Sequence, residues 1–507
     1  MADSRTKNTS RNLFWGVSSK MITILLNFFS RTIILYLLGE KFLGISTLYT
    51  SVLSFLSLAE LGLSSAIIYT MYKPVADNDY VTIGALLNFY KKLYRIIGLT
   101  ILVVGGVLLP FIPYLMNGDA PEGANVYILY LLYLLNSVIG YFFAGYRQSL
   151  LSAYQRQDII TNITTGSVAL MYLLQIAILL LTENFYVYAT IPIFTTVLTN
   201  IGIAIITYKR YPDIKVTGKV EPSTVQAIKK RLSGLIGTKL NSIVVHSADT
   251  IVISAFLGLT LTAQYGNYYY VFNSVCSFLV IIFVSMTPSI GNKLVTDKLE
   301  SNYALFQNLQ FGNAWIVTWC SVCFICLFEP FMEVWAGADM CLGLGFVIPF
   351  VAYFFIYEIQ RTILAFKDAA GLWHKDKWRP YVSMIVNVIS NVIFVNFFGI
   401  YGVVVSSVLA FLISMPWANM VLFRNLFKTS PWKNIWQITK YAVVTAILSA
   451  ITYFACMICH DGILGIVERF ILCCIIPNAL FILFFCKSKE FIYWKTKINT
   501  IFQKRRG

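Results

Sequence analysis

Residues 12–35 read NLFWGVSSKMITILLNFFSRTIIL, a run of 24 residues in which Lys20 and Arg31 are the only charged side chains. A helix crosses the hydrocarbon core of a bilayer with about 20 mostly apolar residues. The apolar run continues past Leu37, which is too long for the core of a signal peptide, and no small-residue cleavage site is evident. We therefore expect a first transmembrane helix over 13–38 that is retained in the protein.

The rest of the 507-residue chain repeats this pattern, since 58% of its residues are hydrophobic and only 12% are charged. Soluble domains carry roughly 25% charged residues, so the bilayer must be the solvent for most of this chain. Further apolar runs fall near 44–70, 96–116, 124–146, 159–182, 185–207, 233–256, 265–290, 309–329, 345–366, 380–398, 402–423, 441–459 and 463–486. The sequence predicts an all-α membrane protein with about fourteen transmembrane helices.

The basic residues give an independent test of this number. The net charge is +16, and most of the Lys and Arg residues lie in alternate loops, as they do in the cytoplasmic loops of membrane proteins. The segments 117–124 and 329–343 lie in the other set of loops and contain acids but no Lys or Arg. This alternation predicts an even number of helices with both termini in the cytoplasm, and it explains the basic charge without nucleic-acid binding.

A weak internal repeat divides the chain. SSK, ending at Lys20, and RTIILYLLG, ending at Gly39, return 219 residues later as GTK, ending at Lys239, and DTIVISAFLG, ending at Gly258. The repeat predicts two parallel six-helix lobes, and transporters built from such repeats bind their substrate between the lobes. We expect an N-terminal lobe over 1–210, a basic cytoplasmic linker over 211–232, a C-terminal lobe over 233–425, and two more helices with a basic tail over 426–507.

Several classes of function are disfavoured. The chain has no G-x-x-x-x-G-K-[ST] loop, so it is not expected to hydrolyse ATP. No predicted outer loop exceeds about 15 residues, which leaves little room for the chemistry of a membrane-embedded polysaccharide polymerase or ligase. We expect a transporter with no catalytic residue, no cofactor and no metal.

Ten cysteines are present, nearly all within apolar segments. Cys320, Cys323 and Cys326 have C-x-x-C-x-x-C spacing, and Cys456 and Cys459 form another C-x-x-C pair. Their position in predicted spans, without a nearby His, favours small packing residues. A metal site or a disulfide is the alternative.

Charged residues inside the predicted spans mark the candidate site, because a charge at the bilayer centre costs at least about 2.5–3.5 kcal/mol. Such residues normally face a bundle interior or a wet cavity. Polar side chains share a helix face with several of them and predict a central cavity. The stripes are Lys20, Asn27 and Arg31; Ser57, Glu60 and Ser64; Lys239, His246 and Thr250, flanked by Ser242 and Asp249; and Ser383, Asn387 and Asn391.

Arg31 and Lys239 lie deepest, and we interpret them as a cationic patch for an anionic substrate, with Lys20 and Arg361 as further candidates. Arginine suits phosphate because its planar fork binds two oxygens at once.

Other interpretations remain open for several of these residues. Lys20 can instead extend to the membrane surface, and Glu358 and Arg361 can form an internal ion pair. Asn387 and Asn391 can bond neighbouring helices, and His246 can be a packed polar residue rather than a proton carrier. Arg31 and Lys239 can themselves be held in buried ion pairs, with Asp249 as the acid nearest to Lys239.

Two further stretches, together with the opening run, resemble a known family. They are LSLAELGLSSAIIYTMYKPVADND (56–79) and GLWHKDKWRPYVSMIVNVISNVIFVNFFGIYGVVVSS (371–407). The chain resembles the Wzx-type flippases for O-antigen or capsule repeat units, which form the polysaccharide transport family of the MOP superfamily.

The resemblance implies two six-helix lobes around a central cavity and two additional C-terminal helices. The implied substrate is an oligosaccharide repeat unit on undecaprenyl pyrophosphate, moved from the inner to the outer leaflet of the bacterial cytoplasmic membrane. Implied partners are membrane lipids, a coupling H⁺ or Na⁺, and the polysaccharide polymerase with its chain-length machinery. Glu60, Asp249 and Glu358 are candidates for ion coupling. An ion-coupled small-molecule or multidrug exporter is the alternative function, and a membrane-embedded polymerase is a weaker one.

Overall fold

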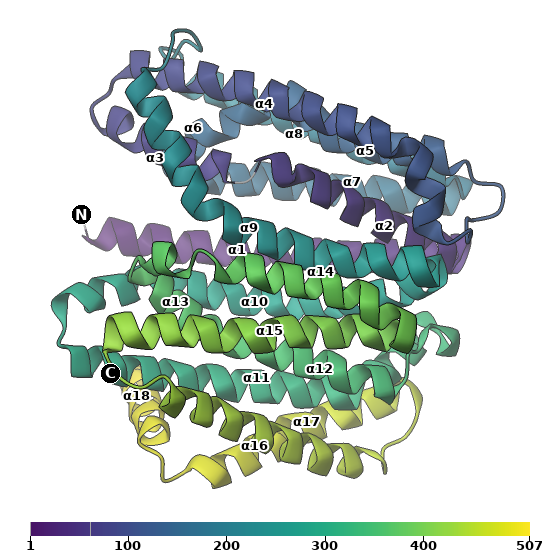
Figure 1. The fold of residues 1–507 in the computed structure, drawn as a ribbon, viewed down its shortest axis with the longest axis vertical. Helices are drawn as coiled ribbons and strands as arrows, with labels where there is room; N and C mark the ends of the chain where they lie inside the picture. The colour runs from purple at the N-terminus through teal and green to yellow at the C-terminus, as the bar shows by residue number, and fades with distance from the viewer. Residues whose placement is uncertain (1, 61, 507) are drawn as a thin grey trace. The chain divides into compact units, whose positions relative to one another are not determined.

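The computed structural model describes residues 2–60 and 62–506, and within these ranges every regular element is a helix (Figure 1). The chain forms two compact units, one ending at Gly266 and one beginning at Asn267, so that the division falls inside one long helix.

The first unit contains the N-terminal helices and the start of α10. Its elements are α1 (Ala2–Leu38), α2 (Glu40–Leu56), η1 (Ser57–Glu60), α3 (Leu63–Ala76), α4 (Tyr80–Leu108), η2 (Leu109–Met116), α5 (Val126–Phe142), η3 (Gly145–Arg147), α6 (Gln148–Ala153), α7 (Gln157–Thr182), α8 (Phe185–Arg210), α9 (Pro222–Leu257) and the first turns of α10 (Leu259–Thr296). Helix α9 packs against α2, α3 and η2 of this unit.

The second unit contains the remainder of α10 and the C-terminal helices. Its elements are α11 (Leu299–Ala336), η4 (Ala338–Met340), α12 (Leu344–Ile359), α13 (Arg361–Ala369), η5 (Leu372–Asp376), α14 (Arg379–Phe398), α15 (Ile400–Leu422), η6 (Phe423–Phe427), α16 (Trp432–Cys456), α17 (Gly462–Phe485) and α18 (Lys489–Arg506). Helix α11 is central here, since it packs against α12, α16 and α17.

Within the described residues, eleven segments are long and apolar enough to cross a membrane, or twelve if the bent pair α5 and η3–α6 is one span. The protein is therefore a multi-pass membrane protein, and the predicted all-α class is confirmed. The predicted number of about fourteen is larger for two reasons. The segment Leu372–Phe427 contains two packed helices, α14 and α15, and the 17-residue α2 is short because its helix is interrupted before α3.

One predicted span is wrong as a continuous helix. The expected helix over 44–70 is broken, because α2 ends at Leu56 and Gly62 has a left-handed φ of +72° before α3 begins. The span expected over 345–366 is confirmed as Leu344–Ala369, although its helix is interrupted at Gln360, between α12 and α13. By contrast, the paired spans near 159–207 and 380–423 agree closely with α7, α8, α14 and α15.

The internal repeat is visible in the backbone. Gly39 ends α1 with φ +89° and ψ 173°, and Gly258 ends α9 with φ +91° and ψ 177°. Each glycine is followed at once by the next helix, and only glycine adopts this conformation readily. Asp119 reinforces the second junction, since its carboxylate accepts bonds from the N–H groups of Leu259 (3.1 Å) and Thr260 (3.4 Å).

Asp119 also forms an ion pair with Lys41, at 2.6 Å, close to the start of α2. The hydrogen bond and charge of Asp119 raise the pKa of the Lys41 ammonium. One loop carboxylate thus connects the first turns of two helices that occupy equivalent places in the repeat.

The GLWHKDKWRP stretch has a structural role in the second unit. The Asp376 carboxylate, buried in the fold, accepts hydrogen bonds from Lys367 and from Arg379 Nε (2.9 Å). Arg379 also donates to Ser414 Oγ at 2.7 Å, which connects α14 to α15. Three charges taken out of water are tolerable only while they remain paired.

We predict that Asp376→Asn destabilises the protein by about 3–5 kcal/mol, because the buried Arg379 loses its counter-charge and Lys367 keeps only Asp368, at 3.9 Å. Thermal unfolding in detergent and abundance in the membrane measure this effect. The matched control is Glu300→Gln, which removes an exposed carboxylate of the same unit. Equal melting temperatures for the two variants would show that the Asp376 cluster does not stabilise this unit.

Candidate functional site

The polar face of α1 lies beside the face that packs on its neighbours. Ser19 bonds Thr165 of α7 (2.5 Å), and the buried Ser30 bonds Tyr188 of α8 (3.1 Å). Lys20, Asn27 and Arg31 lie about 100° round the helix from these serines, and all three are partly exposed. The candidate cations of α1 are thus outside its packed face.

Arg31 lies where α1, α2 and the start of α10 meet. A Cβ built on Gly266 would come within 3.2 Å of an Arg31 terminal nitrogen and 3.0 Å of Thr47 Cγ2. Any larger residue at position 266 would crowd the guanidinium. The small Gly266 and the short Thr47 therefore leave space for the Arg31 head group.

The polar side chains of α9 become more buried toward the C-terminal end of the helix. Lys239 is exposed and His246 is partly exposed, whereas Thr250 and Asp249 are buried. Lys239 and Asp249 are ten residues apart, about 15 Å along a helix axis, so a direct ion pair between them is excluded. Asp249 instead accepts a hydrogen bond from Tyr265 (3.2 Å). The side chain of Ser242 lies outside the described residues.

Glu60 sits at the interruption between α2 and α3. Its two carboxylate oxygens accept hydrogen bonds from Tyr94 of α4 (2.7 Å) and Tyr141 of α5 (2.8 Å). Because the helix is broken here, Ser57 and Ser64 do not continue one regular stripe with Glu60, as the sequence had predicted. Ser57 bonds the carbonyl of Ser54 instead (2.6 Å). The two phenols hold the carboxylate in a partly exposed position.

Glu358 and Arg361 form the internal ion pair that their spacing allows. The Glu358 side chain is fully buried and accepts two hydrogen bonds from the guanidinium, one of them 2.6 Å long from a terminal nitrogen. The guanidinium also lies 5.1 Å from the ring of Tyr357. The charge of Arg361 is therefore compensated within the second unit.

The asparagines of α14 face α15. Asn387 donates to Ser407 Oγ (3.0 Å), and Asn391 donates to Asn387 Oδ1 (3.3 Å). Ser383 reaches the carbonyl of Ala410 at 3.4 Å. All three side chains are buried, which agrees with the interhelical hydrogen bonds considered for them rather than with an open lining.

An apolar groove of about 530 Å³ lies between α12 and α16 of the second unit. Its lining combines small residues of α16 with aromatic and branched side chains. The principal residues are Ile348, Ala352, Phe355, Ala442, Ala446, Ala450 and Phe454. Such a groove fits a hydrocarbon chain rather than a polar ligand.

The sequence identified the charged residues within the spans but not the side chains that form hydrogen bonds with them. Tyr94 and Tyr141 lie 34 and 81 residues from Glu60, and Tyr265 lies on the helix after the one that carries Asp249, so the sequence alone gives no sign of these hydrogen bonds. The groove depends on packing between two helices that are distant in the sequence, which periodicity cannot report.

No family model and no curated protein matches this sequence. Solved structures do match. The structure described as lipid II flippase MurJ in an inward closed conformation aligns with a TM-score of 0.68 at 14% identity, over 93% of this chain and 98% of that one. This chain has the fold of these transporters.

Two other solved structures support the same assignment. An inward-facing multidrug resistance MATE family transporter of the MOP superfamily aligns with a TM-score of 0.63 at 16% identity, over 82% of this chain and 99% of that one. A MOP superfamily transporter from Pyrococcus furiosus, described as having a binding pocket of reverse polarity, aligns with a TM-score of 0.53 at 14% identity, over 83% and 97% of the two chains. The fold is thus found in proteins named for lipid and for drug transport.

We predict that Glu60→Gln leaves membrane abundance near the wild-type level but removes most transport. The amide oxygen still accepts from one tyrosine, so the junction keeps its packing, while the charge is lost. Transport and abundance are measured together in the same cells. A Tyr94→Phe/Tyr141→Phe variant is the structural control, because it removes both donors and keeps the charge. Normal transport by Glu60→Gln would exclude an ionic role for Glu60.

Proposed function

We propose that the protein is a flippase that moves undecaprenyl-pyrophosphate-linked oligosaccharide repeat units from the inner to the outer leaflet of the bacterial cytoplasmic membrane. The observation that carries the proposal is the arginine at the junction of α1, α2 and α10. Arg31 is charged, partly exposed and given space by Gly266. The sequence resemblance to Wzx-type flippases and the fold shared with a protein named as a lipid II flippase support the same substrate class.

The pyrophosphate is the part of this substrate that most needs the protein. A doubly charged group and its sugars cannot enter hydrocarbon without losing their hydration. Arg31 would bind phosphate oxygens through its planar fork, and Lys239 and Lys20 would add positive charge. Asn27, Ser57, Ser64, Ser242, His246 and Thr250 are proposed as neutral polar contacts for water or sugar hydroxyls.

Other predicted ligands are weaker candidates in the described conformation. Arg361 is paired with Glu358, and Asn387 and Asn391 are buried between α14 and α15. For these residues to contact the substrate, their present hydrogen bonds would have to break. We therefore place substrate recognition mainly on the first unit.

The polyprenyl tail is proposed to stay in contact with lipid while the polar head is transferred.

Net export against a concentration difference needs an energy source, and the sequence has no G-x-x-x-x-G-K-[ST] loop. Coupling to H⁺ or Na⁺ through Glu60 or Asp249 is proposed. Both carboxylates accept hydrogen bonds from tyrosines and neither is fully exposed. We propose that such a carboxylate exchanges a cation when the helix junction beside it opens. Both termini are proposed to lie in the cytoplasm. The polymerase and chain-length machinery would then receive the product on the opposite side of the membrane.

An ion-coupled small-molecule exporter is the second candidate, and one observation favours it. Glu60 and Asp249 are carboxylates inside the first unit, and such groups suit organic cations or coupling ions. The two functions differ in the part played by the cations, because a cationic drug gains nothing from Arg31 or Lys239.

The test is complementation of a strain that lacks the protein. We expect the deletion to trap the lipid-linked repeat unit in the inner leaflet and to lose surface polysaccharide. Arg31→Lys should restore part of the export, whereas Arg31→Gln and Lys239→Gln should each lose most of it, because the pyrophosphate requires positive charge. Lys219→Gln removes an exposed lysine of the same unit and is the matched control.

Abundance is scored for every variant, so that loss of transport is distinguished from loss of protein. Normal polysaccharide export by both neutral variants at normal abundance would overturn the cationic mechanism. Normal surface polysaccharide in the deletion strain, with drug efflux lost, would favour the exporter.

A further inference from the structure

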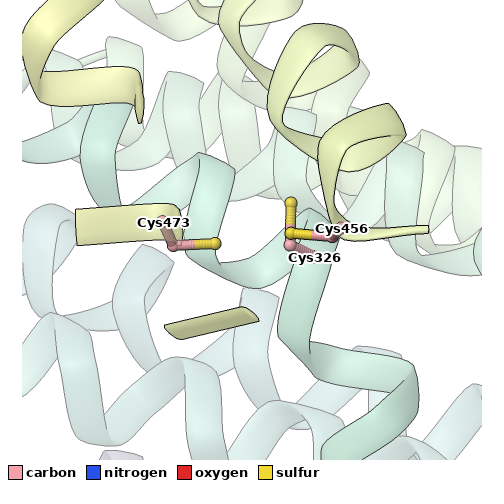
Figure 2. Close-up of side chains that lie close together, drawn as sticks. All are labelled: Cys326, Cys456 and Cys473. Atoms are coloured by element: carbon pink, nitrogen blue, oxygen red, sulfur yellow. The ribbon is translucent and has the colours of Figure 1, made fainter. Parts of the chain in front are cut away.

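Three cysteines from three different helices meet inside the second unit. Cys326 of α11, Cys456 at the end of α16 and Cys473 of α17 are all buried, and their sulfur atoms lie within 4.8 Å of one another (Figure 2). In the sequence, Cys326 and Cys456 are 130 residues apart, and Cys456 and Cys473 are 17 apart. The C-x-x-C spacings had predicted only small packing residues within helices. The fold thus creates a thiol cluster that the sequence does not display.

A fourth thiol lies beside this cluster. Cys323 is one helical turn before Cys326, and its side chain is within hydrogen-bonding reach of Cys473. Cys473 also approaches the side chains of Cys326 and Cys456, so it is the thiol shared by all the others. None of these cysteines is in a disulfide.

The backbone around Cys473 is held in place by α11. Pro477 has no N–H, so it leaves the carbonyl of Cys473 without its helical partner. Trp319 Nε1 donates to that carbonyl at 3.0 Å, and Trp315 Nε1 donates to Asn478 Oδ1 at 2.8 Å. Two indoles one turn apart on α11 therefore fix the part of α17 that carries Cys473, facing the helix that carries Cys323 and Cys326.

We propose that these thiols form a binding site for a thiophilic d¹⁰ metal ion, Cu(I) or Zn(II). Sulfur ligands select these ions, and the cluster identified among the described residues consists of thiols alone. A tetrahedral zinc site with Zn–S bonds of about 2.3 Å needs sulfur atoms about 3.8 Å apart, so small side-chain shifts suffice.

The two ions would use the cluster differently. Cys326, Cys456 and Cys473 are mutual neighbours and supply three-coordinate sulfur, which suits Cu(I). Zinc needs a fourth ligand, and Cys323, which lies outside the group of sulfur atoms within 4.8 Å of one another, would have to turn its side chain toward the ion to supply it. Each metal–thiolate bond replaces an S–H bond, and the proton leaves to water.

A bound ion would connect α16 and α17 to α11 at one point. The C-terminal helix pair would then be held to the second unit by metal coordination as well as by packing. This inference is independent of the proposed transport function, because it rests on the cysteines alone and not on any residue proposed to contact the substrate.

The test uses the full-length protein, purified in mild detergent under reducing conditions and loaded with Zn(II) or Cu(I) in separate arms. After passage over a chelating resin, metal content per protein is measured, together with the melting temperature. We expect about one equivalent of at least one ion, a higher melting temperature, and loss of both effects in Cys473→Ser and Cys326→Ser. Cys323→Ser should lose zinc but keep Cu(I), which distinguishes the two coordination modes.

Cys276→Ser is the control, because Cys276 is a buried thiol outside the cluster. The melting temperature of the wild-type protein with and without metal gives a readout that no folding defect of a variant can confuse. Less than about a tenth of an equivalent in both arms, or unchanged binding by Cys473→Ser, would overturn the proposal.

Discussion

Backbone groups that lose their helical partners within hydrocarbon must find another partner inside the protein, because the bilayer offers none. This chain breaks its helices at several places, and polar side chains compensate at two of them. At the break between α12 and α13, Asn313 donates to the carbonyls of Glu358 (2.9 Å) and Ile359 (3.3 Å), and Gln310 donates to Ile359 (3.1 Å). At Pro477, an indole replaces the missing N–H.

Three of the charged candidates lie at or beside such interruptions. Glu60 lies at the break between α2 and α3, and Glu358 and Arg361 flank Gln360. Arg31 lies within the continuous helix α1, beside the glycine that opens space in α10. A regular helix covered by apolar side chains leaves little room for a charge. An interrupted helix supplies free backbone groups and space, so the constraint that limits the fold also determines where charges can be kept.

Much of the fold follows from the sequence, because hydropathy and helix length are local properties. The apolar runs predicted α7, α8, α14 and α15 nearly to the residue, and the 219-residue repeat correctly paired Gly39 with Gly258. The breaks at 57–62 and 360 were missed because their stabilising partners, Tyr94, Tyr141 and Asn313, are distant in sequence. The charged candidates were found from the sequence, but the partners of Glu60 and Asp249 and the thiol cluster required three dimensions. The ligand roles of Arg31 and Lys239 remain predictions.

We propose that this fold, with its arginine at the α1–α2–α10 junction, transfers a pyrophosphate-linked glycan across a bilayer. The most direct measurement reconstitutes the purified protein in vesicles that contain an undecaprenyl-pyrophosphate-linked oligosaccharide in both leaflets, and adds a membrane-impermeant glycosidase outside. The account predicts that the glycan left uncut in protein-free vesicles becomes cleavable with the wild-type protein but not with Arg31→Gln. The contradicting result is that, with the wild-type protein and an imposed proton or sodium gradient, the glycosidase cleaves only the glycan that began in the outer leaflet.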